Sequence, residues 1–439
     1  MLKAEEYGAA DQAVAGFRRR VMPLIFLAYL MNFIDRTNIS YAQLQMGSEL
    51  GISLAAYGLG AGLFFIGYAG SCVPANLMLR RIGARRWIAA LVIAWGGMSC
   101  LMAAMQGERS FYVLRFCLGL VEGGFAPAVS YYIASWMPPR YRSRVNALLI
   151  MAIPLGLIVG GPLAGALLNI RYGLPGWRWL FLLEGVPTIV LGLLILRVLP
   201  STPRDASWID DRQRRALHAL MQAEAGPADD ASESVWHGFA VFRQPVLWGM
   251  LAVLLIAYAA TFALIYFLPI ILKAMYHITP LQIGALLSLP NIAAFVISYL
   301  VGRSSERFGD TRWHLAAVCL MGSAGFFMLN GAAAISMAAF LAVVSLINGY
   351  TIAYYGPLNA SIQNFIGAKA GPLALVTTIG SLGGFFGPTL TGHMMQMTGG
   401  DWHSAAIVFG FVTLASALLA IVCVRGRRVQ ASVAGQVRA

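Results

Sequence analysis

Long apolar stretches recur along this chain, and short polar connections that carry most of its charges separate them. Each stretch has about 20 mostly apolar residues, the length that an α-helix needs to cross a lipid bilayer. None of them shows the period-2 alternation of transmembrane β-strands. The pattern therefore predicts an all-α polytopic membrane protein with twelve transmembrane helices, at about residues 21–45, 53–78, 87–105, 110–135, 145–168, 178–199, 247–272, 281–302, 313–331, 336–359, 372–397 and 403–424.

The composition of the 439 residues excludes an ordinary soluble enzyme. Hydrophobic residues make up 59% of the chain and charged residues only 11%, whereas soluble domains carry about 25% charged residues. The six histidines lack the spacing of metal ligands or catalytic pairs, and the sequence has no nucleotide-binding loop. We therefore expect no enzymatic activity, no cofactor and no bound metal.

The basic residues predict how the helices are oriented. The net charge is +13, which in a soluble protein would suggest nucleic-acid binding. With twelve helices, however, 25 of the 31 Lys and Arg residues fall on the face that holds both termini, and four fall on the opposite face, Arg109, Arg171, Arg178 and Lys273. Because positive residues stay inside, we expect a multi-pass inner-membrane protein with both termini in the cytoplasm and no nucleic-acid partner.

A polar stretch at 200–246 interrupts the series of apolar segments. It is rich in charged residues and predicts a cytoplasmic linker, with one short helix near 207–224. The expected organisation is a six-helix bundle at 1–199, the linker, a second six-helix bundle at 247–425 and a cytoplasmic tail at 426–439.

An internal repeat relates the two bundles. The loop with Arg81, Gly83, Arg86 and Trp87 recurs 226 residues later as Arg307, Gly309, Arg312 and Trp313. The same displacement carries Gly161-Pro162 onto Gly387-Pro388. Two matches at one offset predict a duplicated six-helix unit, whose copies are related by an axis along the membrane normal. This arrangement places one site between two bundles at mid-membrane.

These motifs resemble the major facilitator superfamily and, within it, the anion:cation symporter family. The resemblance to that family rests on Phe33-Ile-Asp35-Arg36-x-Asn38 and on Arg115-x6-Glu122-Gly-Gly124, and the stretch 64–168 is similar to bacterial tartrate, phthalate and hydroxyphenylacetate permeases. In this family the short basic loops act in gating, so the resemblance assigns Arg81, Gly83, Arg307 and Gly309 to gating loops. Where the family's first loop usually carries an acid, this sequence has Arg80, and the second loop keeps the acid as Glu306.

Four charges fall inside predicted helices of the first half. An ionisable group at mid-membrane costs at least about 2.5–3.5 kcal/mol, and it survives when it faces a cavity and is paired. Asp35, Arg36, Arg115 and Glu122 could form structural ion pairs, but the equivalent positions of the second half, Thr261, Phe262, Leu341 and Asn348, carry no charge. A six-helix bundle therefore does not need them, and we predict a functional role.

An arginine in a partly dehydrated cavity binds a carboxylate bidentately. We expect Arg36 to be the main substrate anchor and Arg115 its companion, with Asp35 and Glu122 as proton-coupling residues. Protonation of an acid would free an arginine for the anion, so proton and anion would bind together. The resemblance implies the same roles, although which arginine contacts the substrate varies within the family.

Uncharged polar residues complete the expected binding site. The candidates are Tyr68, Tyr258, Asn348, Tyr354, Tyr355 and Ser381. The sugar-acid carriers of the resembling family have amides near Ile153-Pro154 and Gly380-Ser381 that are missing here, which favours a smaller dicarboxylate or an aromatic acid. Glu184 follows Arg178 by a turn and a half, and we expect it to cap or pair near the outer end of its helix.

The predicted function is import of an organic carboxylate, such as tartrate or phthalate, by proton symport with alternating access. The expected partners are the carboxylate anion, protons and the lipid bilayer, with the protein as a monomer and sodium coupling not excluded. The alternatives are a proton-coupled efflux antiporter of the same fold, which would normally lack the arginine pair, and a membrane-embedded enzyme.

Overall fold

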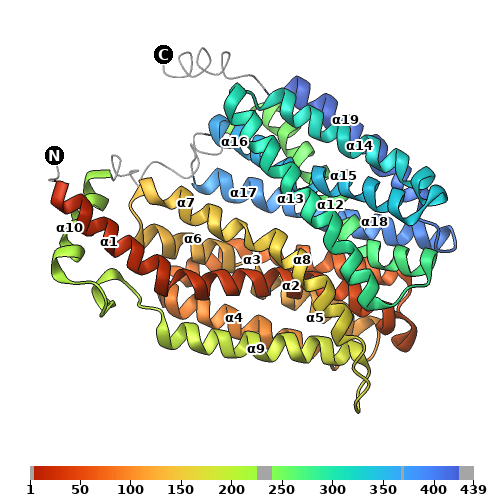
Figure 1. Cartoon of the computed structure of the whole chain (residues 1–439), viewed down its shortest axis with the longest axis horizontal. Helices are drawn as coiled ribbons and strands as arrows, with labels where there is room; N and C mark the ends of the chain where they lie inside the picture. The colour runs from red at the N-terminus through yellow and green to blue at the C-terminus, as the bar shows by residue number, and fades with distance from the viewer. Residues whose placement is uncertain (1–3, 225–239, 367–369, 425–439) are drawn as a thin grey trace.

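The computed structural model describes residues 4–224, 240–366 and 370–424, and within them every regular element is a helix (Figure 1). The helices of the first half are α1 (Ala4–Arg20), α2 (Met22–Leu50), α3 (Leu54–Ile82), α4 (Ala84–Met102), α5 (Glu108–Glu122), α6 (Phe125–Trp136), α7 (Pro139–Ile150), α8 (Ala152–Leu167) and α9 (Gly176–Val198). The linker contains the 3-10 turn η1 (Pro203–Asp205), the helix α10 (Asp211–Glu224) and the 3-10 turn η2 (Ala240–Arg243). The second half contains α12 (Pro245–Tyr276), α13 (Pro280–Phe308), α14 (Arg312–Ile335), α15 (Met337–Ala353), α16 (Tyr355–Ile366), α17 (Ala370–Ser381), α18 (Gly383–Met397) and α19 (His403–Cys423).

The twelve predicted transmembrane segments are confirmed. Four of them are each built from two consecutive helices, namely α5–α6, α7–α8, α15–α16 and α17–α18. Nine segments of the described chain are long and apolar enough to cross a membrane by length and composition alone. The other three segments are α2, α4 and α17–α18, and α2 carries the charged pair Asp35 and Arg36 at its middle.

The two halves repeat the same packing. In the first half α2 packs on α8, α3 on α5 and α4 on α9; in the second half α12 packs on α18, α13 on α15 and α14 on α19. Each contact thus recurs between the equivalent helices, as duplication of one unit predicts. Figure 1 shows the first half, in red to yellow, beside the second half, in green to blue.

Two glycine contacts join the halves. A Cβ atom at Gly58 of α3 would lie 2.3 Å from the Pro388 carbonyl oxygen of α18, and a Cβ at Gly284 of α13 would lie 2.1 Å from the Gly161 carbonyl oxygen of α8. Only glycine allows this approach of backbones. Gly58 and Gly284 are 226 residues apart, so the two contacts are equivalent under the repeat.

Both glycine contacts lie toward one end of the molecule, which we call the distal face, where α2 leads to α3 and α12 to α13. At this face Lys273 Nζ donates to the Leu44 carbonyl oxygen at 2.6 Å, and the Leu54 N–H donates to Gln396 Oε1 at 3.1 Å. The two halves are therefore closed against each other at the distal face.

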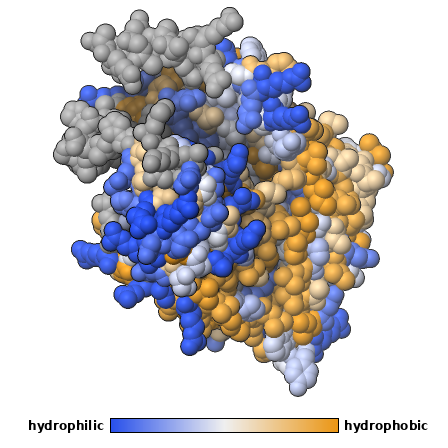
Figure 2. Space-filling view, turned by 60° about the vertical axis from the view of Figure 1, so that its left-hand side comes forward, coloured by the Kyte–Doolittle hydropathy of each residue, from blue (hydrophilic) through white to orange (hydrophobic). Residues whose placement is uncertain are grey.

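The opposite end, the terminal face, carries two helices outside the membrane segments. α10 confirms the short helix expected in the linker, whereas α1 was not predicted, because its apolar positions are mostly alanines in a polar sequence. The two helices pack on each other through a small cluster of buried side chains, Ala9, Ala10, Ala216 and Leu220. Figure 2 shows hydrophilic residues gathered over this end and hydrophobic residues over the flank.

Candidate substrate and ion site

The middle of α2 carries most of the polar groups of the site. Asn32, Asp35, Arg36 and Asn38 lie within two turns, and all four are buried. Residues three or four apart share a helix face, so Arg36 Nη2 donates to Asn32 Oδ1 at 3.2 Å, and Asn38 Nδ2 donates to Asp35 Oδ1 at 3.0 Å. α2 therefore presents two polar clusters, on two different faces.

The first cluster is an ion pair between α2 and α5. Arg36 Nη2 lies 2.9 Å from Glu122 Oε2, and Arg36 Nε donates to the same oxygen at 3.3 Å. Asn32 Nδ2 also donates to Oε2, at 2.9 Å. Glu122 is only 1% exposed, and its other oxygen, Oε1, has no hydrogen-bond partner within the described residues. Removing one member of such a pair costs about 3–5 kcal/mol, so the two charges depend on each other.

Aromatic rings surround the Arg36 guanidinium. Its Cζ atom lies 5.2 Å from the ring centroids of Phe33 and Phe64 and 5.1 Å from that of Tyr68. Each such contact stabilises a cation by about 0.5–2 kcal/mol. The rings surround the guanidinium, and Tyr68, a candidate substrate-binding residue, lies beside Arg36.

Arg115 is the second cation of the site, and it is 0% exposed. Its Cζ lies 4.8 Å from the centroid of Phe64, the ring that also faces Arg36, and its Nη2 donates to the Tyr266 hydroxyl at 3.3 Å. Arg115 Nε and Nη1 have no hydrogen-bond partner within the described chain, and no described carboxylate lies within ion-pair distance. Arg115 is therefore a buried guanidinium with two unused donors.

The second half contributes one face of α12 to the site. Tyr258, Phe262 and Tyr266 follow each other at four-residue intervals, and neighbouring ring centroids are 6.0 and 5.7 Å apart. Phe65 of α3 meets Phe262 with 4.4 Å between ring centroids. The two arginines of the first half thus lie against an aromatic wall of the second half, which includes the predicted residue Tyr258.

The other predicted residues of the second half contact neighbours within that half. Tyr355 is 44% exposed and lies within electrostatic range of Tyr258, and Tyr354 is buried beside it with 6.4 Å between ring centroids. Asn348 Nδ2 donates to Asn291 Oδ1, and Ser381 Oγ donates to the Thr378 carbonyl oxygen of its own helix. Neither Asn348 nor Ser381 has a hydrogen bond to Arg36 or Arg115 in the part of the chain that the structure describes.

The second polar cluster of α2 joins it to α4 and α9. Asn38 Nδ2 donates to Asp35 Oδ1 at 3.0 Å and to Glu184 Oε2 at 2.7 Å, and Ser99 Oγ donates to Asp35 Oδ1 at 2.6 Å. The expectation that Glu184 pairs near the end of its helix is therefore wrong. Arg178 pairs instead with Glu49 at 3.2 Å, because α9 begins at Gly176 and Glu184 lies two turns further in.

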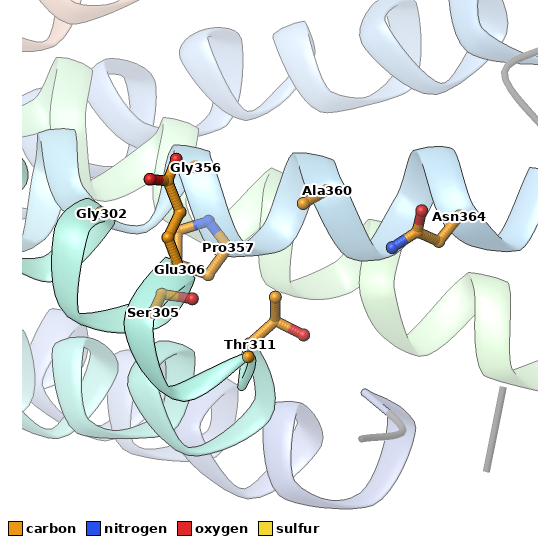
Figure 3. Close-up of a pocket in the computed structure, with 9 residues that line it drawn as sticks. Gly302, Ser305, Glu306, Thr311, Gly356, Pro357, Ala360 and Asn364 are labelled. Atoms are coloured by element: carbon orange, nitrogen blue, oxygen red, sulfur yellow. The ribbon is translucent and has the colours of Figure 1, made fainter. Parts of the chain in front are cut away.

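Of two cavities in the described structure, one adjoins these clusters and the other lies away from them. A cavity of about 30 Å³ lies between the halves, and Thr37, Asn291 and Asn348 are among its lining residues. A larger cavity, of about 340 Å³, lies at the terminal face within the second half, where Glu306 of α13 faces α16 (Figure 3). No lining residue of the larger cavity belongs to the arginine site.

The predicted gating loops are short turns between helices. Gly83 (φ +85°) separates α3 from α4, and Gly309 (φ +63°) ends α13, so both loops turn on a glycine with positive φ. Arg81 and Arg307 are exposed beside these turns. The described residues contain no group of three or more His, Cys, Asp or Glu side chains that could hold a metal.

Sequence reasoning missed several residues of the site. Asn32 and Asn38 lie one turn from Arg36 and Asp35, and this spacing could have indicated them. Phe64 and Phe65 gave no such signal, because their roles depend on how α3 packs against its neighbours. The sequence indicates Glu184 as an acid within a helix, but its contact with Asn38 depends on how α9 packs against α2.

Buried ionisable groups in a helical bundle of two similar halves are typical of membrane transporters. Residues 25–385 match the model of the Major Facilitator Superfamily, and the chain belongs to this family. It is 37% identical over 414 residues to a protein of Agrobacterium vitis named "Putative tartrate transporter", with 92% of this chain and 90% of that protein covered. It is 35% identical to a quinolone resistance transporter of Acinetobacter baumannii, with 87% and 88% covered.

A solved structure has the same fold. A bacterial homolog of the human lysosomal transporter Spinster, in an inward-facing and unoccupied conformation, superposes with a TM-score of 0.73. The superposition covers 93% of this chain and 95% of that protein at 18% identity. The match extends over both halves, as the family assignment requires.

Proposed function

We propose that the protein imports an organic carboxylate anion, such as tartrate or phthalate, by proton symport with alternating access. The observation that carries this proposal is Arg115, a fully buried guanidinium whose Nε and Nη1 atoms have no hydrogen-bond partner among the described residues. A buried charge without a counter-ion is costly, and a carboxylate offers two oxygens to a guanidinium. A bound substrate carboxylate would therefore supply Arg115 with hydrogen-bond acceptors and a negative charge.

Arg36 and Glu122 provide the coupling. The arginine is bound to Glu122 through one carboxylate oxygen, and both side chains are buried. A substrate carboxylate can take the place of Glu122 only if the charge of Glu122 is removed, because two anions beside one cation repel each other. Protonation of Glu122 thus releases Arg36 for the anion, and proton and substrate bind in the same step.

The basic residues indicate the orientation of the protein. Most of them lie at the terminal face, which favours a cytoplasmic location for this face and for both termini. The halves are closed at the distal face, so the described conformation would receive and release ligand from the cytoplasmic side. The name of the Agrobacterium vitis relative supports a carboxylate as the substrate.

The test is uptake of tartrate and of phthalate by proteoliposomes that contain the purified protein, with an acidic exterior. Accumulation above equilibrium is expected, and it should persist when sodium is replaced by choline. Arg115→Gln should weaken uptake by about 10- to 100-fold, as loss of charged hydrogen bonds predicts. Arg178→Gln, at the distal face, is the matched control and should leave uptake unchanged. Equal effects of the two substitutions would contradict the proposal.

Proton-coupled efflux is the second candidate, favoured by the quinolone-resistance relative. The two directions make different predictions for the same vesicles. An efflux antiporter would move a cationic or neutral drug against its gradient in exchange for protons, and it would not accumulate a carboxylate under an inward proton gradient.

A further inference from the structure

The second polar cluster of α2, with Asp35, Asn38 and Glu184, has no role in the symport proposed for Arg36 and Glu122. Asp35 and Glu184 are 3% and 4% exposed, and neither forms an ion pair with a described basic side chain. Each has one oxygen, Asp35 Oδ2 and Glu184 Oε1, without a hydrogen-bond partner in the described structure. The two carboxyl groups are therefore both buried, and two of their four oxygens accept no hydrogen bond from the described residues.

A single amide links the two carboxyl groups. Asn38 Nδ2 donates to Asp35 Oδ1 at 3.0 Å and to Glu184 Oε2 at 2.7 Å, which uses both N–H groups of the amide. The amide brings no charge, so two ionised carboxylates here would leave two uncompensated negative charges. Since like charges that share a site cannot both remain ionised at little cost, such a pair takes up protons as a unit.

The packing of α9 on α4 brings Glu184 to this position. A Cβ atom at Gly185 would lie 2.7 Å from the Gly96 carbonyl oxygen, and one at Gly96 would lie 2.9 Å from the Gly185 carbonyl oxygen. The two backbones therefore touch beside Glu184. Because α9 begins at Gly176, Glu184 lies about 12 Å along the helix, near mid-membrane.

The surroundings of the pair contain few other charges. From α5, Arg115 and Glu122 act on Asp35 electrostatically, and Asp35 in turn acts on the Cys100 thiol of α4. Arg36 is the next residue of α2 but is bound to Glu122. α8, which also packs on α2, has no charged side chain.

We propose that Asp35, Asn38 and Glu184 form a second proton-binding site, separate from Arg36–Glu122, and that Glu184 is a proton-coupling residue. This inference rests on the proposed symport and on the expected role of Asp35, and it adds Glu184 and Asn38 as the residues that complete a second site. The proton binds a carboxyl oxygen of the pair, and it is released when the pair meets the cytoplasm. Because Asp35 and Arg36 are neighbours on α2, loading this site acts on the same helix that holds the substrate anchor.

The first test needs no substrate. Infrared difference spectra of the purified full-length protein, recorded across pH, report protonated carboxyl groups through their C=O stretching band. We expect Glu184→Gln to remove a pH-dependent band and Asp35→Asn to remove or shift the same band. Glu49→Gln, which changes a carboxylate outside this site, is the matched control and should keep it. Spectra of Glu184→Gln identical to those of the wild type would overturn the inference.

The second test separates coupling from transport, with tartrate and phthalate as probes. Glu184→Gln should lose accumulation driven by a pH gradient but retain counterflow exchange, and Glu184→Asp, which restores a titratable group, should recover accumulation. Gradient-driven accumulation by Glu184→Gln equal to that of the wild type would overturn the inference. If the wild type itself neither exchanges nor accumulates the probes, the proposed function fails, and the infrared result alone then decides whether the second site exists.

Discussion

The contact between Gly284 and Gly161 predicts how one substitution redistributes the conformations of the transporter. A Cβ at Gly284 would lie 2.1 Å from the Gly161 carbonyl oxygen and 2.8 Å from the Pro162 nitrogen. These are backbone atoms, which cannot move aside as a flexible side chain can. Gly284→Ala should therefore destabilise the state that is closed at the distal face.

The expected destabilisation of the closed state equals the cost of overpacking, about 1–3 kcal/mol. The clash exists only while α8 and α13 are packed in this way, so the whole cost falls on the closed state. A difference of this size changes the ratio of two conformations by about 5- to 150-fold. A protein that favours the distal-closed state should then populate a distal-open state to a measurable extent.

Spin labels at Ser48 and Ala274, two exposed positions on opposite halves near the distal face, report this change. We expect Gly284→Ala to add a longer distance to the distribution measured by double electron–electron resonance, in a background without the native cysteines. Gly302→Ala on the same helix is the control, because a Cβ there meets nothing within 4 Å. Gly302→Ala and Gly284→Ala gain the same helix propensity, about 1 kcal/mol, so the two variants differ in the clash. Identical distributions for the two variants would refute the reasoning.

Three further substitutions test the arginine site. Glu122→Gln should abolish uptake driven by a pH gradient while counterflow continues, and equal loss of both in the transport assay would argue against coupling. Arg36→Lys removes the bidentate fork, so the carboxylate that stabilises the wild type in a thermal-shift assay should bind at least tenfold more weakly; unchanged affinity would exclude Arg36 as an anchor. Tyr266→Phe removes the hydroxyl that accepts from Arg115 Nη2 at 3.3 Å, a bond worth about 1 kcal/mol; a roughly fivefold loss of affinity is expected, and no loss would show that Tyr266 does not position Arg115.

The membrane segments and the charged residues of the site could be predicted from the sequence. Long apolar stretches have no other stable environment than a bilayer, and a charge within such a stretch has few reasons to persist other than function. Both signals are local, and therefore the sequence reveals Asp35, Arg36, Arg115 and Glu122 without any knowledge of their neighbours.

The partners of these charges could not be predicted in the same way. The seven-residue spacing of Arg115 and Glu122 indicates one face of one helix, yet Glu122 binds Arg36 of α2 and Arg115 binds Tyr266 of α12. Phe64 lies against both arginines and determines which groups they can reach. Which groups the two arginines contact therefore depends on the packing of α3 on α5. The residue pattern of a single helix does not contain that information.

The helix α1 and the position of Glu184 were also not predicted correctly, because both depend on packing between helices. α1 escaped prediction because a search for apolar stretches does not detect a stripe of alanines, which suffices to bury a helix against α10. Glu184 was placed too close to the end of its helix, because the charge of Arg178 nearby suggested a pair that Glu49 forms instead.

The chemical groups of the transporter are divided unequally between its two halves. Arg36, Arg115 and the buried acids all belong to the first half, whereas the second half contributes aromatic and hydroxyl groups such as Tyr258, Phe262 and Tyr266. Changes in the second half can therefore alter which molecule fits without disturbing the groups that carry charge. Under the proposed symport, exchange of second halves between relatives is therefore a route to transporters of new specificity.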